Sequence, residues 1–416
     1  MAKEGKLAAV PKLRFPEFLE AEDWGLKHGD DLFNAINNRG PSEALPILAI
    51  TQEHGAIPRD QINYHVSVTE QSIESYKSVE KGDFIISLRS FQGGIEYSNY
   101  RGICSPAYVI LRRKCKGSDG YFRHLFKSAR FIQQLTRNIE GLRDGKMISY
   151  RQFSEQLIPT PIPAEQQKIG DCLTSLDELV AAQGRKVQAL KSYKRGLMQQ
   201  LFPREGETLP RLRFPEFRDA PEWEERQLDT CFSHIRNGFV GTATPFYVAG
   251  GSPYLQGKNV KKGRINPSGL VTVSKDFHDK QKKSQLRRGD IVMVQSGHVG
   301  ECALIDGDFV GANCHALIIM TPIERLHPPF FVHCFGSDFG VRLIAQITIG
   351  NTIKHILARE VKALVVRVPH FTEQQRIADC LSSIDDLISR ESRKLDALKT
   401  HKKGLMQQLF PASEEA

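Results

Sequence analysis

The chain has 416 residues, 40% of them hydrophobic, enough for two or three domains with buried cores. Lysine and arginine outnumber aspartate and glutamate by 57 to 48, and the resulting charge of +9 favours a polyanionic partner such as nucleic acid. No apolar run is long enough to span a membrane, no secretory leader is evident, and the eight cysteines form no CxxC pair, so we expect a cytoplasmic protein with reduced thiols.

The first motif is an N-terminal arm, PKLRFPEF at 11–18, followed by Trp24. The same arm returns as PRLRFPEF at 210–217, 199 residues later, followed by Trp223 at the same offset. These are the only two tryptophans in the chain. Such a repeat predicts a tandem duplication of a unit of roughly 200 residues.

The first lobe, residues 25–163, mixes short apolar runs with polar turns, which predicts a mixed α and β fold. We expect strands at 84–88 and 107–111 and helical structure near 121–137. Positive charge is spread along this lobe. Side chains that suit contacts with DNA bases are Arg89, Ser90, Gln92 and Tyr97. The alternative for each of them is an ordinary solvated surface residue.

The segment 164–202 predicts one long helix, because Pro163 and Pro203 bracket it and apolar residues recur in an alternating four-three spacing. This seam comprises Ile169, Leu173, Leu176, Val180, Val187, Leu190, Leu197 and Leu201. Gln183 and Lys194 interrupt it. A helix of this length spans roughly 57 Å and would expose a continuous apolar stripe if it stood alone.

The second arm and second lobe occupy residues 203–371, where we expect the same mixed fold, with strands at 291–294 and 316–320 and helical structure near 328–345. LysGlyAsp at 81–83 is echoed by ArgGlyAsp at 288–290. This lobe carries a dense basic stretch, which suits phosphate contacts. Its candidate DNA-binding residues are Gln256, Lys258, Asn259, Lys261, Lys262, Arg264, Gln295, Ser296 and His298.

Residues 372–411 repeat the first helix at an offset of 208, with about 24 of 40 positions identical. The second seam comprises Ile377, Leu381, Ile384, Ile388, Leu395, Leu398, Leu405 and Leu409, interrupted by Glu391 and Lys402. Antiparallel pairing of the twin helices is the simplest way to bury both seams, and the polar interruptions could fix their register. The alternative is that each helix packs only on its own lobe.

A search for an active site finds none. His327-Pro328-Pro329-Phe330 resembles the tetrapeptide of adenine methyltransferases but has His in the first place, and no glycine-rich loop precedes it. It fits better as the start of a helix opened by proline. No P-loop is present, and Cys314-His315 and His333-Cys334 fit no standard zinc spacing.

These motifs together resemble the specificity subunit of type I restriction-modification enzymes. The resemblance rests on the arm with its tryptophan, the GDF or GDI strand at 82–84 and 289–291, and the helix that opens with GluGlnGln and closes with GlyLeuMetGlnGlnLeuPhePro. All three occur twice, in the same order, and span essentially the whole chain.

The resemblance implies an α+β protein with two target-recognition lobes separated by two long antiparallel coiled-coil helices. The expected domains are 1–163 and 203–371 for the lobes with their arms, 164–202 and 372–411 for the helices, and 412–416 for a tail. Its partners would be double-stranded DNA, read as an asymmetric bipartite site, two methyltransferase (modification) subunits, and restriction subunits. Catalysis and cofactors would belong to those partners, so no catalytic residue, metal or cofactor is expected here. The alternatives are a coiled-coil adaptor that binds no DNA and a stand-alone DNA methyltransferase.

Overall fold

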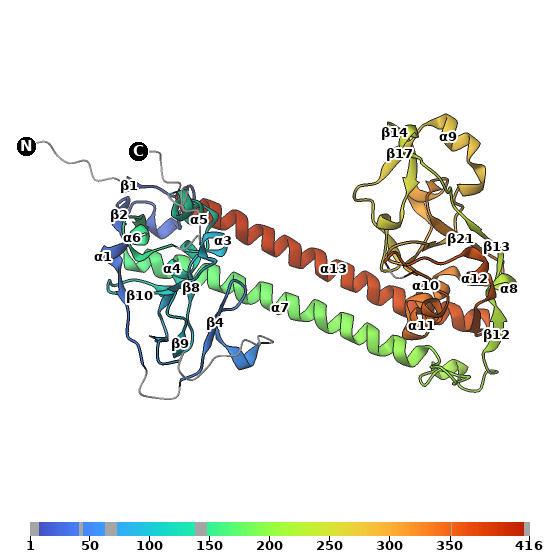
Figure 1. Ribbon diagram of the computed structural model, residues 1–416, viewed down its shortest axis with the longest axis horizontal. Helices are drawn as coiled ribbons and strands as arrows, with labels where there is room; N and C mark the ends of the chain where they lie inside the picture. The colour runs from blue at the N-terminus through green and yellow to red at the C-terminus, as the bar shows by residue number, and fades with distance from the viewer. Residues whose placement is uncertain (1–7, 41–44, 63–72, 138–147, 351, 412–416) are drawn as a thin grey trace, which may run out of the picture. The chain divides into compact units, whose positions relative to one another are not determined.

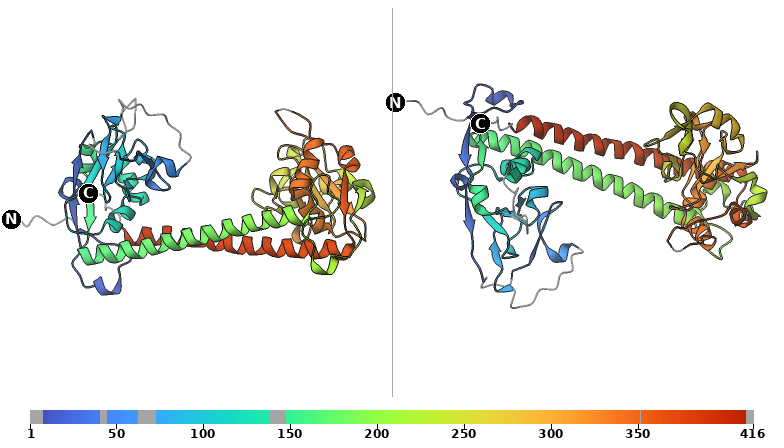
Figure 2. Two further views of the ribbon diagram at one scale, coloured as in Figure 1. Left: turned by 90° about the horizontal axis from the view of Figure 1, so that it is seen from below. Right: turned by 45° about the horizontal axis from the view of Figure 1, so that its top comes forward.

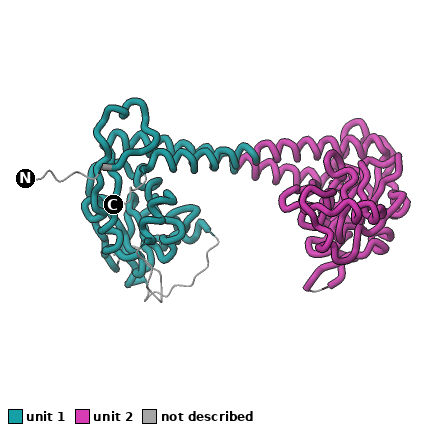
Figure 3. The backbone as a smooth tube through the Cα atoms, turned by 90° about the horizontal axis from the view of Figure 1, so that it is seen from above, with its two compact units in different colours: residues 1–184, 393–416 teal, residues 185–392 magenta. Residues whose placement is uncertain are grey.

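The computed structural model describes residues 8–40, 45–62, 73–137, 148–350 and 352–411. The chain divides into two compact units, which are coloured separately in Figure 3. Unit 1 comprises residues 1–184 and 393–416, and unit 2 comprises residues 185–392. Each unit therefore contains one lobe together with part of each long helix.

Unit 1 has an α+β fold with two main sheets. The smaller sheet contains β1 (Ala8–Ala9), β2 (Trp24–His28) and β11 (Leu157–Thr160), in that order. The larger is antiparallel and contains β3 (Phe33–Ile36), β10 (Val109–Arg113), β7 (Phe84–Ile86) and β8 (Glu96–Tyr97), in that order. Two further pairs are β4 (Leu48–Thr51) with β5 (Gly55–Pro58) and β6 (Lys77–Val79) with β9 (Gly102–Cys104). The short helices are α1 (Gly29–Leu32), α3 (Ser90–Gly93), α4 (Asp119–Leu125), α5 (Ala129–Thr136) and α6 (Tyr150–Ser154), as Figure 1 shows.

Unit 2 repeats the main sheet of this plan. Its main antiparallel sheet contains β13 (Phe232–Asn237), β21 (Leu317–Pro322), β18 (Ile291–Val294) and β19 (Cys302–Leu304), in that order. β12 (Glu224–Gln227) pairs with β22 (Val365–Val368), and the helices are α8 (Leu228–Cys231), α10 (Pro328–Gly336), α11 (Asp338–Gln346) and α12 (Ala358–Ala363). Its other elements are a sheet of β17 (Val271–Val273), β14 (Tyr247–Leu255) and β20 (Asn313–Cys314), the pair β15 (Val260–Lys261) and β16 (Arg264–Ile265), and α9 (Lys275–Lys280).

The two four-stranded sheets share strand order and direction, which confirms the duplication inferred from the sequence. The echo between residues 81–83 and 288–290 marks the turn that precedes β7 and β18. The Asp83 carboxylate accepts the backbone N–H of Glu80 at 2.7 Å, and that of Asp290 accepts the backbone N–H of Arg287 at 2.8 Å. Both aspartates are buried, so the shared motif fixes a turn.

The helical stretches expected near 121–137 and 328–345 are each broken into two helices at a serine. Ser128 accepts a hydrogen bond from the backbone N–H of Phe131 and caps α5. Ser337 accepts from Gly340 and caps α11 in the same way. A serine side chain satisfies one of the free N–H groups at a helix start, which is why both copies restart at this residue. His327 precedes α10 as its N-cap residue, so the prolines after it do open a helix.

The two long helices are α7 (Pro163–Leu201) and α13 (Phe371–Leu409). Within each unit they lie side by side and antiparallel, as both views of Figure 2 show. In unit 2 the Lys186 ammonium contacts Glu391 at 2.9 Å and that of Lys194 contacts Asp385 at 2.6 Å. In unit 1 Lys402 pairs with Asp177. The charged interruptions of the seam therefore form ion pairs between the helices, as the register hypothesis requires.

All sixteen predicted seam residues are buried or half-buried. The outermost ones also pack into the lobes: Ile169, Leu173 and Leu409 join the core around Trp24, and Leu201, Ile377 and Leu381 join the core around Trp223. Pairing with the twin helix and packing on the lobe, which the sequence offers as alternatives, therefore occur together. Each helix pairs with its twin and anchors a lobe at the same time.

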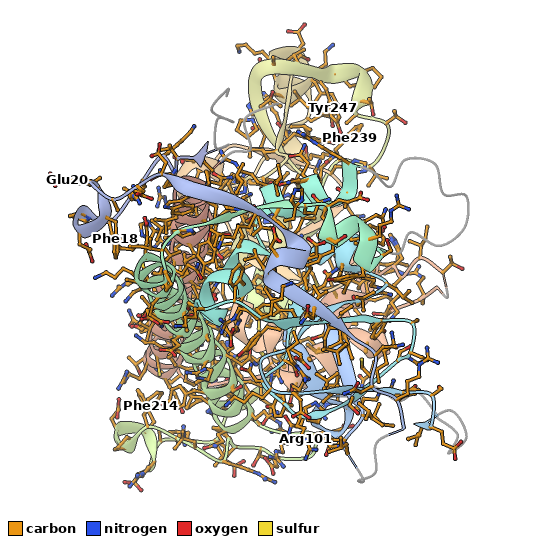
Figure 4. All side chains as sticks on the ribbon, turned by 90° about the vertical axis from the view of Figure 1, so that its left-hand side faces the viewer. Phe18, Glu20, Arg101, Phe214, Phe239 and Tyr247 are labelled. Carbon is orange, nitrogen blue, oxygen red and sulfur yellow. The ribbon has the colours of Figure 1, made fainter. Side chains whose placement is uncertain are left out.

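The repeated arm locks both helices to each lobe. Arg14 binds Glu165 through two hydrogen bonds of 2.8 Å, and Arg213 binds Glu373 through bonds of 2.8 and 2.7 Å. All four side chains are at least nine-tenths buried. The backbone N–H of Leu13 donates to the Gln408 carbonyl at 3.0 Å. Each arm thus ties the beginning of one long helix to the end of the other (the first arm carries Phe18 in Figure 4).

All eight cysteines are free thiols, and five of them are buried. Burial raises the pKa of the Cys104 and Cys314 thiols to about 12, so both stay protonated at neutral pH. Among the described residues, no helix is long and apolar enough to cross a membrane.

Candidate nucleic-acid interface

A groove of about 600 Å³ lies in unit 2 between the last turns of α7 and the lobe. Its helix side carries Lys191, Lys194, Arg195 and Met198. Its lobe side includes Lys262 and His298, two of the residues predicted to contact DNA, together with Val341 and Ile344 of α11. The structure therefore brings two predicted residues together with cations on the helix that the sequence reasoning missed.

A groove of about 770 Å³ lies at the corresponding place in unit 1, between α13 and the start of α5. Its helix side carries Lys399, Lys402, Lys403 and Met406, each 208 residues after its counterpart in unit 2. Its lobe side adds Lys12, Lys127 and Arg130, and no acidic residue among the described ones lines it. The duplicated helix end thus presents the same basic face to a groove in both units.

Some cations of this basic face are paired with carboxylates, and others are exposed to solvent. Lys194 and Lys402 are half-buried and paired with carboxylates of the twin helix. Lys191, Arg195, Lys399 and Lys403 are exposed. Each unit therefore contributes two exposed helix cations to its groove. We call these four residues the helix cations.

A buried histidine lies beneath each ion pair of the basic face. The His124 Nε2 atom lies 3.2 Å from the Thr174 hydroxyl, and the His333 Nε2 atom lies 3.1 Å from that of Ser382. Burial lowers the pKa of His124 to about 4, and Lys402 acts in the same direction. Burial lowers the pKa of His333 to about 3. Both imidazoles are neutral at physiological pH.

We therefore expect the protein to lose stability as the pH falls from 6.5 toward 4. In that window the unfolded histidine takes up a proton and the folded one does not, so the free energy of unfolding falls by up to about 1.4 kcal/mol per pH unit for each histidine. Around His124 the charges are Lys402, Asp177 and Arg123; around His333 they are Lys194, His327, Arg264 and Asp385. Urea titrations at pH 7 and pH 5 measure the effect, and His124→Asn should reduce it. An equal loss in wild type and variant would contradict this assignment.

Most of the predicted DNA-binding residues of the second lobe lie at the surface. Lys258, Lys261, Lys262 and His298 are exposed, and Ser296 is half-exposed. The Lys262 backbone has φ +50°, and its N–H donates to the Glu301 carboxylate at 2.7 Å. Arg264 is exposed but pairs with Asp386 of α13 at 2.6 Å, so its charge is already partly neutralised.

Several predicted base-reading side chains are occupied within the fold. Ser90, Asn259 and Gln295 are buried, and a buried side chain cannot reach a base. Ser90 accepts the backbone N–H of Ser87, and Asn259 donates to the Asn266 carbonyl, so both brace loops. Their assignment to the DNA surface is therefore corrected.

Gln256 is half-buried, and its amide donates to the Tyr247 hydroxyl at 2.8 Å. Tyr247, labelled in Figure 4, begins β14. Gln256 therefore lies just after β14, at the end of the β17-β14-β20 sheet, with one hydrogen-bonding group already satisfied. It remains a candidate contact.

In the first lobe, Arg89 and Gln92 are exposed on and beside the short helix α3. Tyr97 is half-buried, with its ring 5.1 Å from that of Phe84 and its hydroxyl 3.5 Å from Asp119. One face of the ring packs on the sheet, and Tyr97 stays a predicted base contact.

Much of the positive charge of the first lobe is neutralised within the lobe. The guanidinium of Arg112 binds the buried Asp83 through two hydrogen bonds of 2.8 Å. Arg113 binds Asp119 at 2.7 Å. These pairings cannot be read from the sequence, and they leave less of the positive charge of the first lobe for phosphate contacts.

Within the described part of the chain, no three histidine, cysteine, aspartate or glutamate side chains gather as ligands for a metal ion.

The fold defines a class: an internally duplicated α+β protein whose two lobes share a pair of antiparallel helices. The sequence matches the family described as type I restriction modification DNA specificity domain over residues 21–192 and 221–400. The chain belongs to this family. As a specificity subunit it is a non-catalytic component of a type I restriction-modification system.

Relatives and solved structures agree with this assignment. The type I restriction enzyme MjaVIII specificity subunit of Methanocaldococcus jannaschii is 22% identical, covering 98% of this chain and 96% of its own. The EcoBI specificity subunit of Escherichia coli is 21% identical, covering 66% and 62%. The S subunit from M. genitalium has a TM-score of 0.57 at 15% identity, covering 98% and 100%. A chain from a structure of complex assembly and conformational transition of the type I R-M system has a TM-score of 0.55 at 17% identity, covering 94% and 98%.

Proposed function

We propose that the chain reads an asymmetric bipartite DNA site, with one half-site read by each unit. The observation that carries this proposal is the duplicated groove. In both units, the same helix positions supply cations beside lobe loops that differ in sequence. Repeated cations suit the phosphates, which are the same at every sequence, and diverged loops suit the bases, which differ.

We propose further that the chain holds two modification subunits, and restriction subunits where they are present, on the DNA that it reads. The long helices α7 and α13 run through both units, so they are the element through which the spacer between half-sites would be set. The expected domains are the two lobes with their arms, the two helices and the tail. The cytoplasm is the expected compartment.

The test is the pattern of modification in cells that carry this chain with its modification partner. Modification-sensitive sequencing should reveal one motif made of two short half-sites around a fixed spacer, and the motif should vanish when the chain is deleted. A continuous motif, or a motif that persists after deletion, would contradict the proposal.

The adaptor alternative makes a different prediction for the exposed lysines of the second lobe. If unit 2 contacts phosphates, replacing Lys258, Lys261 and Lys262 by glutamine should weaken DNA binding and reduce the salt slope by about 0.9 for each phosphate that is no longer neutralised. Band-shift titrations of the assembled complex at several salt concentrations measure both. If the salt slope is the same for the variant and the wild type, the adaptor alternative is favoured.

A further inference from the structure

The two units differ at the first residue of the helix that follows the capping serine. In unit 2 this residue is Asp338 of α11, and in unit 1 it is Ala129 of α5 (both helices are labelled in Figure 1). Both residues are exposed. At this position, therefore, one copy of the duplicated structure carries a carboxylate and the other carries only a methyl group.

In unit 2 the carboxylate is bound by the end of the long helix α7. The side-chain amide of Gln199 donates a hydrogen bond to the Asp338 carboxylate at 2.8 Å. The pocket that contains both residues has a volume of about 270 Å³ and is also lined by Arg204 and Arg342. The chain thus supplies the cations, the amide donor and the anion of this pocket.

In unit 1 the corresponding place lacks the carboxylate. Gln407 is the counterpart of Gln199, 208 residues later, and it lines the groove of about 770 Å³ together with Ala129. Its side chain is exposed and makes no hydrogen bond to another residue in the described part of the chain. The donor that binds the carboxylate in unit 2 is therefore free for a ligand in unit 1.

The cations that line the unit 1 groove are only partly neutralised within the fold. The paired ones are Lys127 with Glu96 and Lys402 with Asp177. Those that form no ion pair with a carboxylate of the described residues are Lys12, Arg130, Lys399 and Lys403. The three lysines of this second set are exposed, and Arg130 donates one N–H to the Phe410 carbonyl at 2.9 Å. The groove of unit 1 therefore has cations and a free amide donor without an anion of its own.

We infer that the groove of unit 1 binds one DNA backbone phosphate at the place where Asp338 supplies the anion in unit 2. In addition to the helix cations, Lys12, Arg130 and Gln407 provide donors for its oxygens, and such side chains are common phosphate contacts in DNA complexes. The half-site read by unit 1 then has one phosphate contact that the other half-site lacks. This inference rests on the proposed function, since it adds a contact to one of the two half-sites.

Exchanging the two residues tests the inference in the assembled complex of this chain with its modification partner, on the duplex motif found by sequencing. Ala129→Asp gives unit 1 the carboxylate of unit 2. Binding should then weaken about fivefold at roughly 0.15 M salt, and the slope of log affinity against log salt should fall by about 0.9. Asp338→Ala removes the carboxylate from unit 2, so affinity and slope should both rise. Band-shift titrations at several salt concentrations measure these changes.

Ala164→Asp is the matched control, because Ala164 is also an exposed alanine in the first turn of a helix of unit 1 and does not line the groove. It makes the same change of charge, and its salt slope should equal that of the wild type. Equal thermal unfolding of all the variants excludes misfolding. The inference is overturned if Ala129→Asp gives the same slope as Ala164→Asp, or if Asp338→Ala leaves the wild-type slope.

Methylphosphonate duplexes identify the anion, because each replacement removes the charge of one phosphate and leaves the bases unchanged. Several replacements should weaken binding of the wild-type chain. One of them, in the half-site read by unit 1, should lose its effect with Ala129→Asp and keep it with Ala164→Asp. If instead Ala129→Asp impairs assembly with the modification subunit and every methylphosphonate keeps its effect, the groove binds a protein carboxylate and the inference is overturned. A motif that is not bipartite overturns the proposed function instead.

Discussion

Replacing Lys191 and Arg195 together by glutamine should reduce the affinity of the assembled complex for its duplex DNA about 30-fold at roughly 0.15 M salt. Both are exposed helix cations at the groove of unit 2. If each contacts one phosphate, the slope of log affinity against log salt should fall by about 1.8, because each contact releases roughly 0.9 counterion. Band-shift or fluorescence-anisotropy titrations between about 50 and 200 mM salt measure both quantities, since the affinity changes roughly tenfold over this range for every two phosphate contacts.

The duplication supplies a replicate of this experiment. Lys399 and Lys403 occupy the same helix positions in unit 1, so their double replacement should give a loss of similar size. Lys186→Gln is the control, because Lys186 lies on the same helix, pairs with Glu391 and does not line the groove. Loss of affinity with an unchanged salt slope would show that the helix cations act on folding or assembly and not on phosphates.

Replacing Arg213 by methionine should lower the free energy of unfolding by about 3–5 kcal/mol, the cost of leaving a buried carboxylate without its partner. The Glu373 side chain is 1% exposed, and the arginine is its ion-pair partner. The double variant Arg213→Met, Glu373→Leu should recover most of this loss, because it removes the unpaired charge as well.

Hydrogen exchange of the whole chain locates the effect of that change. Arg213→Met should increase exchange in unit 2, near the start of α13 and the end of α7, while unit 1 keeps its protection. Arg14→Met, which breaks the equivalent pair with Glu165, should give the opposite pattern. If both variants loosen the same unit, the two ion pairs do not act locally and the assignment is wrong.

The fold could be predicted well from the sequence because its strongest signals are periodic. The seam spacing and the bracketing prolines located both long helices, and the apolar runs located β7 and β18. The repeated arm and the repeated helix sequence were enough to establish the duplication. A helix break at one residue is harder to predict, since Ser128 and Ser337 differ little from other serines within a helical pattern and cap a helix only because the chain turns there.

The candidate interface could be predicted only in part. Exposed lysines such as Lys258 and Lys261 were found by charge density, which is visible in the sequence. Burial of a single side chain is not visible in the sequence. Ser90 and Asn259 were therefore assigned to the surface, although they are buried and brace loops. The helix cations were missed because only the apolar seam of the long helices was considered, and not their polar face. The sequence did contain a signal for them, because Lys191 is repeated as Lys399 at the offset of the two helices.

Unit 1 is made from two stretches of chain separated by the whole of unit 2. Its core includes Leu409 and Phe410, which follow the whole of unit 2 in the sequence. At typical rates of about 5–20 residues per second, the first lobe leaves the ribosome roughly 10–50 seconds before the helix end that completes its core. Unit 2 is continuous and can close first. During synthesis there is therefore an interval in which unit 2 can be folded while the apolar core of unit 1 is still incomplete and exposed. Chaperones would be most needed in this interval.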